Sequence, residues 1–234
     1  MHNKYNNEAK VFVAVDCIIF GFDPNAEELK ILLIKRNFEP EKGNWSLMGG
    51  FMEPGETLKE AANRVLNTLT GLENIFLEQL KTFSIVDRDP AERTISVAYF
   101  ALINVVDFKD ELYRDFSATW FKISEKPKLI FDHNDMVTLA MERLRFKASV
   151  EPIGFELLPA KFTMRQLQML YEEIFEEKYD KRNFSKKVNS FGLLKRLDEK
   201  DKSSSKKGSF LYEFDMEKYK KRSNGFQIRH QIMN

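Results

Sequence analysis

The sequence GGFMEPGETLKEAANRVLNTLTGL, residues 49–72, decides the fold of the first part of the chain. A glycine turn leads into a helix, and Thr57 and Glu60 have the spacing of a capping box, which satisfies exposed amides in the first turn. Apolar residues then recur at helical spacing, and Gly71 is placed to end the helix. The stretch therefore predicts an amphipathic helix with a defined start and end.

The same stretch resembles the Nudix box. The positions in register with the family's glycine, glutamate, arginine and apolar residues are Gly50, Glu56, Arg64, Leu66, Gly71 and Leu72. Three glutamates of the family are replaced, by Val65, Thr68 and Leu69. In Nudix hydrolases those glutamates hold divalent ions that activate water against a diphosphate, and Mg²⁺ requires hard oxygen ligands. The resemblance therefore implies a fold element without the enzyme's chemistry, and we predict neither a metal site nor catalytic residues.

Two alternatives stay open at this point. The first is an ordinary capped helix whose register with the Nudix box is coincidental. The second is a working hydrolase with displaced metal ligands, because Glu53, Glu56 and Glu60 remain near the start of the helix. The empty glutamate positions favour a protein that is not an enzyme.

Composition limits the other classes of protein. The chain has 234 residues, 43% of them hydrophobic, which is enough for one large or two modest domains. The single cysteine, Cys17, cannot form an internal disulfide and suits a reducing compartment, so we expect a cytoplasmic protein without a membrane span. The three histidines are scattered, without the spacing of a zinc site. We expect no cofactor.

Charge is distributed unevenly between the two parts of the chain. Residues 161–234 carry 18 Lys or Arg and 11 Asp or Glu, a balance of +7, whereas residues 1–160 have a balance of −6. Such a split is typical of a basic module that contacts a polyanion and is joined to a more acidic body.

The first part of the chain alternates between apolar strand patterns and helix patterns. Strands are expected at residues 10–20, 31–35, 82–86, 94–102 and 118–123, and a helix at residues 136–148 with Asp132 or Asn134 near its cap. This order predicts an α/β (α+β) fold that matches the Nudix sheet-and-helix sandwich, over residues 1–153.

The second part begins after Pro152 and is predicted as a winged helix-turn-helix domain over residues 154–234. Thr163 and Gln166 form another capping box, and Asp180 is placed to cap a second helix at residues 181–191. Two short apolar runs, residues 193–197 and 210–214, flank a loop that we expect to be flexible. From Tyr219 onward we expect a loosely ordered basic tail.

The second helix of such a domain enters the DNA major groove. The candidate DNA-binding residues on this helix and in the following loop are Lys181, Arg182, Asn183, Ser185, Lys186, Lys187, Asn189, Lys206 and Lys207. The lysines suit phosphate contacts, and Arg182, Asn183, Ser185 and Asn189 suit base edges. The alternative is a solvated helix face, but its position on a second helix with lysines in the next loop favours double-stranded DNA.

Over its whole length the chain resembles the Nudix-related transcriptional regulators. The resemblance is carried by VDCIIFGF, LLIKRNFEP, NWSLMGGF, DRDPAER, SVAYFALI, IFDHNDMV, VEPIGFELLP and DKRNFSKKV. It is strongest to the bacterial branch that represses L-arabinose utilisation genes and releases DNA when the sugar binds. A sister branch senses ADP-ribose and controls NAD metabolism. Both branches imply a homodimer on a two-fold operator.

In Nudix folds the ligand lies over the sheet beside the box helix. The candidate ligand-binding residues are therefore Lys35, Arg36, Trp45, Phe51, Asp87, Arg88, Asp89, Arg93, Asp132 and His133. Trp45 or Phe51 would be the aromatic platform for a sugar, and an ADP-ribose diphosphate would use Arg36, Arg88 and Arg93. The alternative is that Trp45 belongs to the core and residues 87–93 form a solvated turn.

The function predicted from sequence is a ligand-responsive DNA-binding repressor. L-arabinose or a related pentose is the expected effector, and a regulator that responds to ADP-ribose is the alternative. A Nudix hydrolase with an accessory domain is the competing hypothesis from another class.

Overall fold

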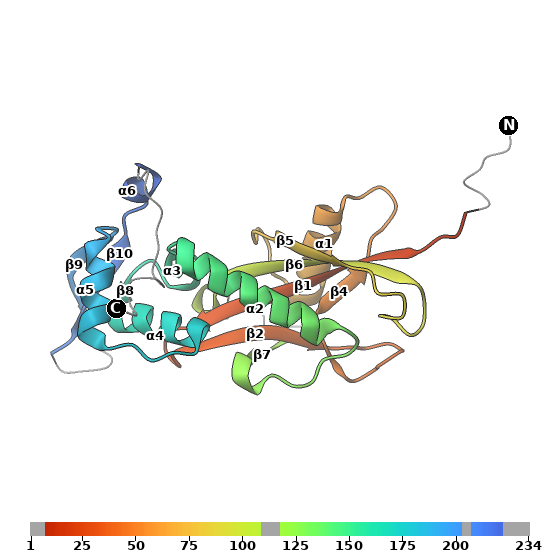
Figure 1. Cartoon of the computed structure of the whole chain (residues 1–234), viewed down its shortest axis with the longest axis horizontal. Helices are drawn as coiled ribbons and strands as arrows, with labels where there is room; N and C mark the ends of the chain where they lie inside the picture. Colours follow the sequence, from red (N-terminus) through yellow and green to blue (C-terminus); the bar gives the residue numbers. More distant parts are fainter. Residues whose placement is uncertain (1–7, 109–117, 203–206, 222–234) are drawn as a thin grey trace.

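A computed structural model describes residues 8–108, 118–202 and 207–221 of the chain. The molecule is elongated, with a larger sheet-containing domain at one end of the long axis and a small helical domain at the other (Figure 1). None of the helices in the described part of the chain is long and apolar enough to cross a membrane.

The larger domain is built on a seven-stranded mixed sheet with the order β3-β2-β1-β6-β5, in which β4 pairs with β1 and β7 with β2. The strands are β1 (Phe12–Asp23), β2 (Glu28–Lys35), β3 (Trp45–Ser46), β4 (Met48–Phe51), β5 (Glu78–Phe83), β6 (Thr94–Asn104) and β7 (Ala118–Lys122). β1 runs parallel to β6, with register from Phe12 opposite Thr94 to Phe22 opposite Asn104. Two short 3₁₀ helices, η2 (Val105–Phe108) and η3 (Ile123–Glu125), follow β6 and β7.

Both faces of the sheet are covered, which explains why β1 is almost continuously apolar. Alternate residues of a strand point to opposite faces. Ile18 and Phe20 belong to one core cluster with α2 (His133–Val150), while Cys17 and Ile19 belong to the other cluster with α1 (Leu58–Thr70). The predicted α/β sandwich of the Nudix type is confirmed.

The helix ends follow the sequence signals closely. Thr57 and Glu60 form the predicted capping box on α1, and Gly71 adopts a left-handed conformation with φ of 74° as its C-cap. In the second domain Thr163 and Gln166 form the same motif at the start of α4 (Met164–Phe175). Local chemistry therefore determined where these helices begin.

The smaller domain is a winged helix domain. Its elements are α3 (Gly154–Leu157), β8 (Phe162–Thr163), α4, α5 (Lys181–Ser190), β9 (Leu194–Asp201), β10 (Ser209–Phe214) and α6 (Met216–Lys221), and its sheet has the order β8-β10-β9. Leu170, Tyr171 and Phe184 are fully buried between α4 and α5. This core is continuous with the α2 face of the larger domain, so the two domains share one apolar cluster.

Three sequence expectations need correction. β5 occupies Glu78–Phe83 instead of residues 82–86, because its register is set by pairing with β6, and Ile85 and Val86 lie exposed beyond the paired segment. β9 continues to Asp201 through residues expected in a loop, because Asp201 pairs with Ser209 in the hairpin. Tyr219 lies in α6 and packs against the core, so the described start of the tail is ordered.

Polar contacts fix α4 to the larger domain at both of its ends. Arg165 forms two hydrogen bonds with Glu27, in the turn between β1 and β2. At the other end, Arg145 of α2 donates to the Ile174 carbonyl at 3.0 Å and pairs with Glu176 at 3.1 Å. Helix α4 of the winged domain is therefore held by the Nudix domain.

Candidate functional site

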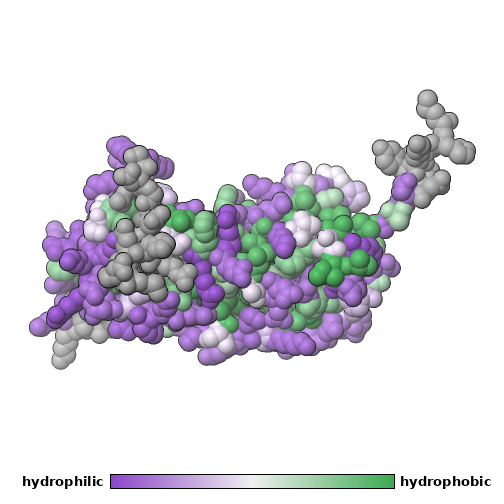
Figure 2. Space-filling view, in the orientation of Figure 1, coloured by the Kyte–Doolittle hydropathy of each residue, from purple (hydrophilic) through white to green (hydrophobic). Residues whose placement is uncertain are grey.

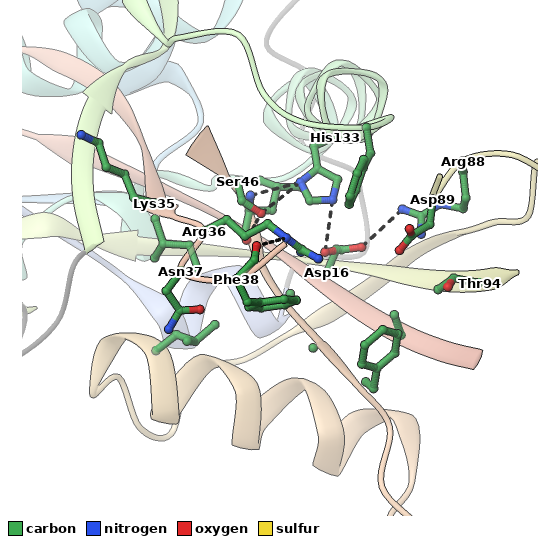
Figure 3. A pocket seen from close by; sticks show the side chains of 18 residues that line it. Asp16, Lys35, Arg36, Asn37, Phe38, Ser46, Arg88, Asp89, Thr94 and His133 are labelled. Carbon is green, nitrogen blue, oxygen red and sulfur yellow. Dashed lines mark hydrogen bonds and ion pairs between the residues drawn. The ribbon is translucent and has the colours of Figure 1, made fainter. Parts of the chain in front are cut away.

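A pocket opens at the edge of the sheet between β1, β4, the start of α2 and the turn before β6. Its lining residues are Ala14, Asp16, Ile34, Lys35, Arg36, Asn37, Phe38, Ser46, Leu47, Gly49, Gly50, Phe51, Leu69, Arg88, Asp89, Thr94, Phe131 and His133 (Figure 3). Its empty volume is about 770 Å³, part of which is open to solvent.

The floor of the pocket is a network of buried polar side chains. Asp16 of β1 is only 4% exposed, and its Oδ2 atom accepts a 2.6 Å hydrogen bond from the Ser96 hydroxyl. The same oxygen lies 3.6 Å from Nη2 of Arg88, and Oδ1 lies 3.5 Å from Nε2 of His133. Figure 3 shows the carboxylate of Asp16 between His133 and Arg88.

His133, the first residue of α2, is neutral in this environment. Its Nδ1 atom accepts from the Leu47 amide at 3.2 Å, so the ring proton lies on Nε2, which faces Asp16. Burial lowers the pKa of His133, and the nearby Asp16 carboxylate only partly opposes this effect. The imidazole therefore contacts Ser46 of β3, the Leu47 amide and Asp16 of β1, and it adds no charge to the floor.

Arg88 is held by Asp132 through two hydrogen bonds. Nε of Arg88 donates to Oδ2 at 2.9 Å, and Nη2 donates to Oδ1 at 2.7 Å. Asp132 occupies the N-cap position of α2 but its side chain makes no cap hydrogen bond, because it is engaged with Arg88. Asp132 therefore lies at the cap position, as expected, but its carboxylate does not bond to the amides of the first turn.

The rim of the pocket is aromatic and cationic. The Arg36 guanidinium lies 3.8 Å from the centre of the Phe38 ring and 5.3 Å from that of Phe131. Phe38 and Phe51 are about half exposed on either side of the opening. These groups offer flat surfaces and one positive charge to a ligand that enters from solvent.

The structure brings six of the ten predicted ligand residues to the pocket: Lys35, Arg36, Phe51, Arg88, Asp89 and His133. The amine of Lys35 nevertheless points away from the others and lies 5.2 Å from the centre of the Trp45 ring (Figure 3). The hydrogen bonds of Arg88 to Asp132 leave Arg36 as the cation at the rim.

The other four predicted residues lie outside the pocket lining. Trp45 packs edge-on against Phe121 in the core, as the alternative for this residue stated. Arg93 donates to the carbonyls of residues 84 and 85 and stabilises the turn, on which Asp87 is exposed. Asp132 accepts hydrogen bonds from Arg88.

Sequence reasoning missed Asp16, Ser46, Phe38 and Phe131. Asp16 could have been found, because it is a lone carboxylate inside the apolar run of β1, where an unpaired charge is costly. The other three carried no such signal. They reach the pocket because β3 and the loop before it follow β2, the neighbour of β1, and because Ser46 contacts His133 at the start of α2.

The former metal positions on α1 do not fit a divalent cation. Val65 is buried against Gly50, Thr68 is exposed, and Leu69 lines the pocket with an apolar side chain. Within the described ranges no group of three or more metal-ligating side chains is found.

The carboxylates that remain near α1 have partners within the chain. Glu56 forms two hydrogen bonds with Arg64, which lowers the pKa of that carboxyl to about 2. Glu53 lies 3.3 Å from Arg64, and Glu60 completes the capping box. No step that needs a divalent metal can be derived from these residues.

In the smaller domain α5 presents a basic face to solvent. Its candidate residues Lys181, Arg182, Asn183, Lys186 and Asn189 are exposed, whereas Ser185 and Lys187 are half-buried. Asp180 caps the helix by accepting from the amides of residues 182 and 183. Lys207 is exposed near the wing tip, and Lys206 lies outside the described residues.

Comparison with known proteins agrees with both domains. Residues 10–139 match the NUDIX domain family, and residues 154–214 match the NrtR DNA-binding winged helix domain. The ADPR responsive transcriptional repressor NtrR of Acinetobacter baylyi is 32% identical over 211 residues, 88% of this chain and 83% of that protein. The chain belongs to the NrtR-type transcriptional repressors.

Solved structures of this repressor family have the same architecture. NrtR of Shewanella oneidensis in complex with a 27mer DNA matches with a TM-score of 0.76 and 26% identity, over 92% of this chain and 97% of that chain. The NUDIX domain of the same protein, complexed with ADP ribose, matches with a TM-score of 0.52 and 26% identity, over 61% and 94%.

The NrtR relatives correct the predicted function. The expectation of a repressor of L-arabinose utilisation is wrong, because the relative that is similar over most of the chain responds to ADPR. The predictions of a DNA-binding transcriptional repressor with a Nudix and a winged helix domain are confirmed. In this family both branches share the architecture, so motifs that resembled one branch did not identify the effector.

Proposed function

We propose that this chain is a repressor whose Nudix pocket binds ADP-ribose and whose winged helix domain then releases operator DNA. The observation that carries the proposal is the similarity, over 88% of the chain, to a repressor that responds to ADPR. The NUDIX domain of Shewanella oneidensis NrtR, which has a similar fold, was solved with ADP ribose.

The chemistry of the pocket supports a ligand of this kind. ADP-ribose combines an aromatic base, a diphosphate and sugar hydroxyls. The rim carries Phe38 and Phe51 as surfaces for a base and Arg36 as a cation for a diphosphate, and the floor carries buried polar groups for hydroxyls.

The chain is proposed to bind this ligand without hydrolysing it. Val65, Thr68 and Leu69 supply no carboxylate at the positions that hold metal ions in the hydrolases, and Val65 is part of the core. Glu56 is neutralised by Arg64 through two hydrogen bonds. A Nudix fold without these ligands suits a sensor, because the effector persists after it binds.

Helix α2 offers a direct connection between the pocket and the DNA-binding domain. Its first residue, His133, lies in the pocket floor, and near its other end Arg145 bonds to the last turn of α4. Figure 1 shows α2 extending from the sheet domain towards the winged domain. Allosteric coupling requires that the ligand bind the two states with different affinity, and a shift of α2 would supply that difference.

We further propose that the repressor acts as a homodimer on a two-fold operator. A two-fold protein presents two recognition helices to half-sites about one helical turn apart, which is the usual geometry for helix-turn-helix regulators. Light scattering of the purified protein checks the stoichiometry.

Binding and release test the proposed function. ADP-ribose at a hundredfold excess over its Kd is expected to stabilise the folded state by about 2.7 kcal/mol and to weaken operator binding. Because coupling is reciprocal, operator DNA must weaken ADP-ribose binding by the same factor. An unchanged melting temperature with ADP-ribose, or turnover of ADP-ribose with Mg²⁺ or Mn²⁺ at ordinary enzyme rates, would contradict the proposal.

A pair of variants tests the route through α2. Arg145→Ala is expected to reduce the factor by which ADP-ribose weakens DNA binding, because it removes the contacts with Ile174 and Glu176. Arg143→Ala is the control, since Arg143 lies on the same helix but bonds to Glu78 within the Nudix domain. An equal effect of both substitutions would show that α2 does not transmit the signal through Arg145.

A further inference from the structure

We propose that Asp16 selects the ligand by accepting hydrogen bonds from the vicinal hydroxyls of its terminal ribose, which lies on the pocket floor. This inference rests on the proposed function and adds the orientation of the ligand and the residue that determines specificity. Asp16 would be the group that distinguishes ADP-ribose from nucleotides that end in a phosphate.

The placement of Asp16 needs an explanation beyond folding. It interrupts an apolar strand and is 4% exposed. Burying a carboxylate costs several kcal/mol unless the group is hydrogen-bonded or paired. An apolar residue at this site would avoid that cost. The neighbouring residues of β1, Val15 and Cys17, are fully buried and apolar. A retained carboxylate at the bottom of a pocket is therefore a candidate for ligand recognition.

The two oxygens of Asp16 differ in their surroundings. Oδ2 is engaged by the Ser96 hydroxyl at 2.6 Å and by the guanidinium of Arg88 at 3.6 Å. Oδ1 lies 3.5 Å from Nε2 of the neutral His133, the outer limit of a hydrogen bond. A carboxylate oxygen can accept more than one hydrogen bond, so Oδ1 retains capacity for a hydroxyl donor.

Gly49 leaves room for this oxygen. Gly49 pairs with Asp16 in the register between β4 and β1 and lines the pocket. A Cβ atom at this position would lie 2.3 Å from Oδ1, so any side chain there would displace the carboxylate. Oδ1 therefore occupies the space that the missing side chain leaves in the pocket wall.

The charges around the Asp16 carboxylate disfavour the phosphate end of a ligand at the pocket floor. Asp16 and Asp132 are both acidic, Arg88 is committed to Asp132 through two hydrogen bonds, and His133 is neutral. A phosphate on the floor would lie beside the Asp16 and Asp132 carboxylates, which share the single guanidinium of Arg88, and like charges repel strongly where water is excluded. A neutral diol avoids this repulsion and supplies the two donors that a carboxylate accepts.

The rim then takes the other parts of the ligand. Arg36 is the cation at the opening and would face the diphosphate, while Phe38 and Phe51 offer flat surfaces to the base. The order from floor to rim is therefore ribose, diphosphate and base. In this orientation the terminal ribose, which ADP lacks, contacts Asp16.

The test compares the affinities of ADP-ribose and ADP by isothermal titration calorimetry of the full chain. Asp16→Asn keeps the shape of the side chain but removes its charge. It is expected to lower the affinity for ADP-ribose by about 10-fold or more. The affinity for ADP should change by less than about 3-fold, because ADP makes no contact with the floor. Asp89→Asn is the matched control, since this second lining aspartate lies at the rim, and it should change both affinities by the same factor.

The wild-type chain provides a second readout that does not depend on folding of a variant. An ADP-ribose analogue that lacks the terminal 2″ and 3″ hydroxyls should bind no more tightly than ADP. The assignment of Asp16 is overturned if the analogue binds as tightly as ADP-ribose. It is also overturned if Asp16→Asn lowers the affinities for ADP and ADP-ribose by the same factor or changes neither affinity. If wild-type protein binds neither nucleotide, the proposed function itself fails.

Discussion

Helices α1 and α5 are both capped by a side chain and carry charges on an exposed face, but they use those charges differently. On α1, Arg64 is paired with Glu53 and Glu56 of its own chain. On α5, Lys181 and Arg182 are exposed, and no carboxylate of the described residues lies within ion-pair distance of them. Figure 2 shows that the winged domain is mostly hydrophilic, whereas hydrophobic surface gathers on the Nudix domain.

The difference separates structural charge from charge that is available to a partner. The ion pairs of α1 are satisfied within the chain and hold the glycine turn against the helix. Within the described part of the chain, Lys181 and Arg182 of α5 have no such compensation, which is the condition for contacts with DNA phosphates.

The largest effect is expected where a former metal position has become core. Val65→Glu should lower the free energy of unfolding by about 3 kcal/mol or more, because it places a carboxyl group against Gly50 in a dry site. Thr68→Glu restores a carboxylate at an exposed position of the same helix and should change stability by less than about 0.5 kcal/mol. Urea denaturation measures both. Equal effects would show that α1 still tolerates the family's metal-binding residues.

The next effect concerns α5. Lys181→Ala with Lys186→Ala should lower the affinities for operator DNA and random DNA alike by about 30-fold at 0.15 M salt, because two phosphate contacts are lost. The slope of log K against log salt should fall by about two. Lys42→Ala with Lys59→Ala changes the net charge equally but lies in the Nudix domain, so it should leave DNA binding unchanged. Equal losses would mean that net charge rather than the α5 face governs binding.

The caps of the two helices give a smaller and more discriminating comparison. Thr57→Ala and Asp180→Ala should each lower stability by about 1 kcal/mol, because each leaves amides of a first turn without an acceptor. Only Asp180→Ala should also reduce operator affinity, since it loosens the helix that we place in the groove. A similar loss of DNA binding for Thr57→Ala would show that both substitutions act through the stability of the whole protein and not through the position of α5.

The smallest effect is a dependence on pH. The hydrogen bonds from Arg64 lower the pKa of Glu56 from its ordinary 4.5 to about 2 in the folded state. The stabilisation is therefore fully present above pH 4.5 and is lost as the pH falls through about 2. Arg64→Ala should flatten this part of the stability profile and leave the slope between pH 6 and 8 unchanged. Urea denaturation at pH 3 and pH 6 checks this, and an unchanged acid slope would contradict the role of the pair.

Local sequence signals predicted the helices better than the strand ends. The capping boxes at Thr57 and Thr163 depend only on neighbouring residues, so the sequence alone located both helix starts. β5 was misplaced because the run that includes Ile85 and Val86 is apolar, yet the segment that pairs with β6 is the more polar Glu78–Phe83. Strand pairing is a non-local property that an apolar run does not report.

The candidate pocket was predicted in part for the same reason. Arg36, Phe51 and His133 were found from position and residue type, whereas Trp45 was placed in the pocket but packs against Phe121 in the core. Whether an aromatic residue on a short strand faces a pocket or a core depends on the sheet to which that strand adds.

The sequence by itself determined the two-domain organisation, the loss of the metal-binding glutamates and the basic face of α5, because each depends on residue identity and local spacing. Only the tertiary structure decided which charges remain available. Arg88 and Asp132, far apart in the sequence, are joined by two hydrogen bonds, and Asp16 meets His133 and Ser96 across the sheet. These pairings are set by strand register and helix packing, and the interaction between charges depends on distance in space, which the order of residues along the chain does not contain.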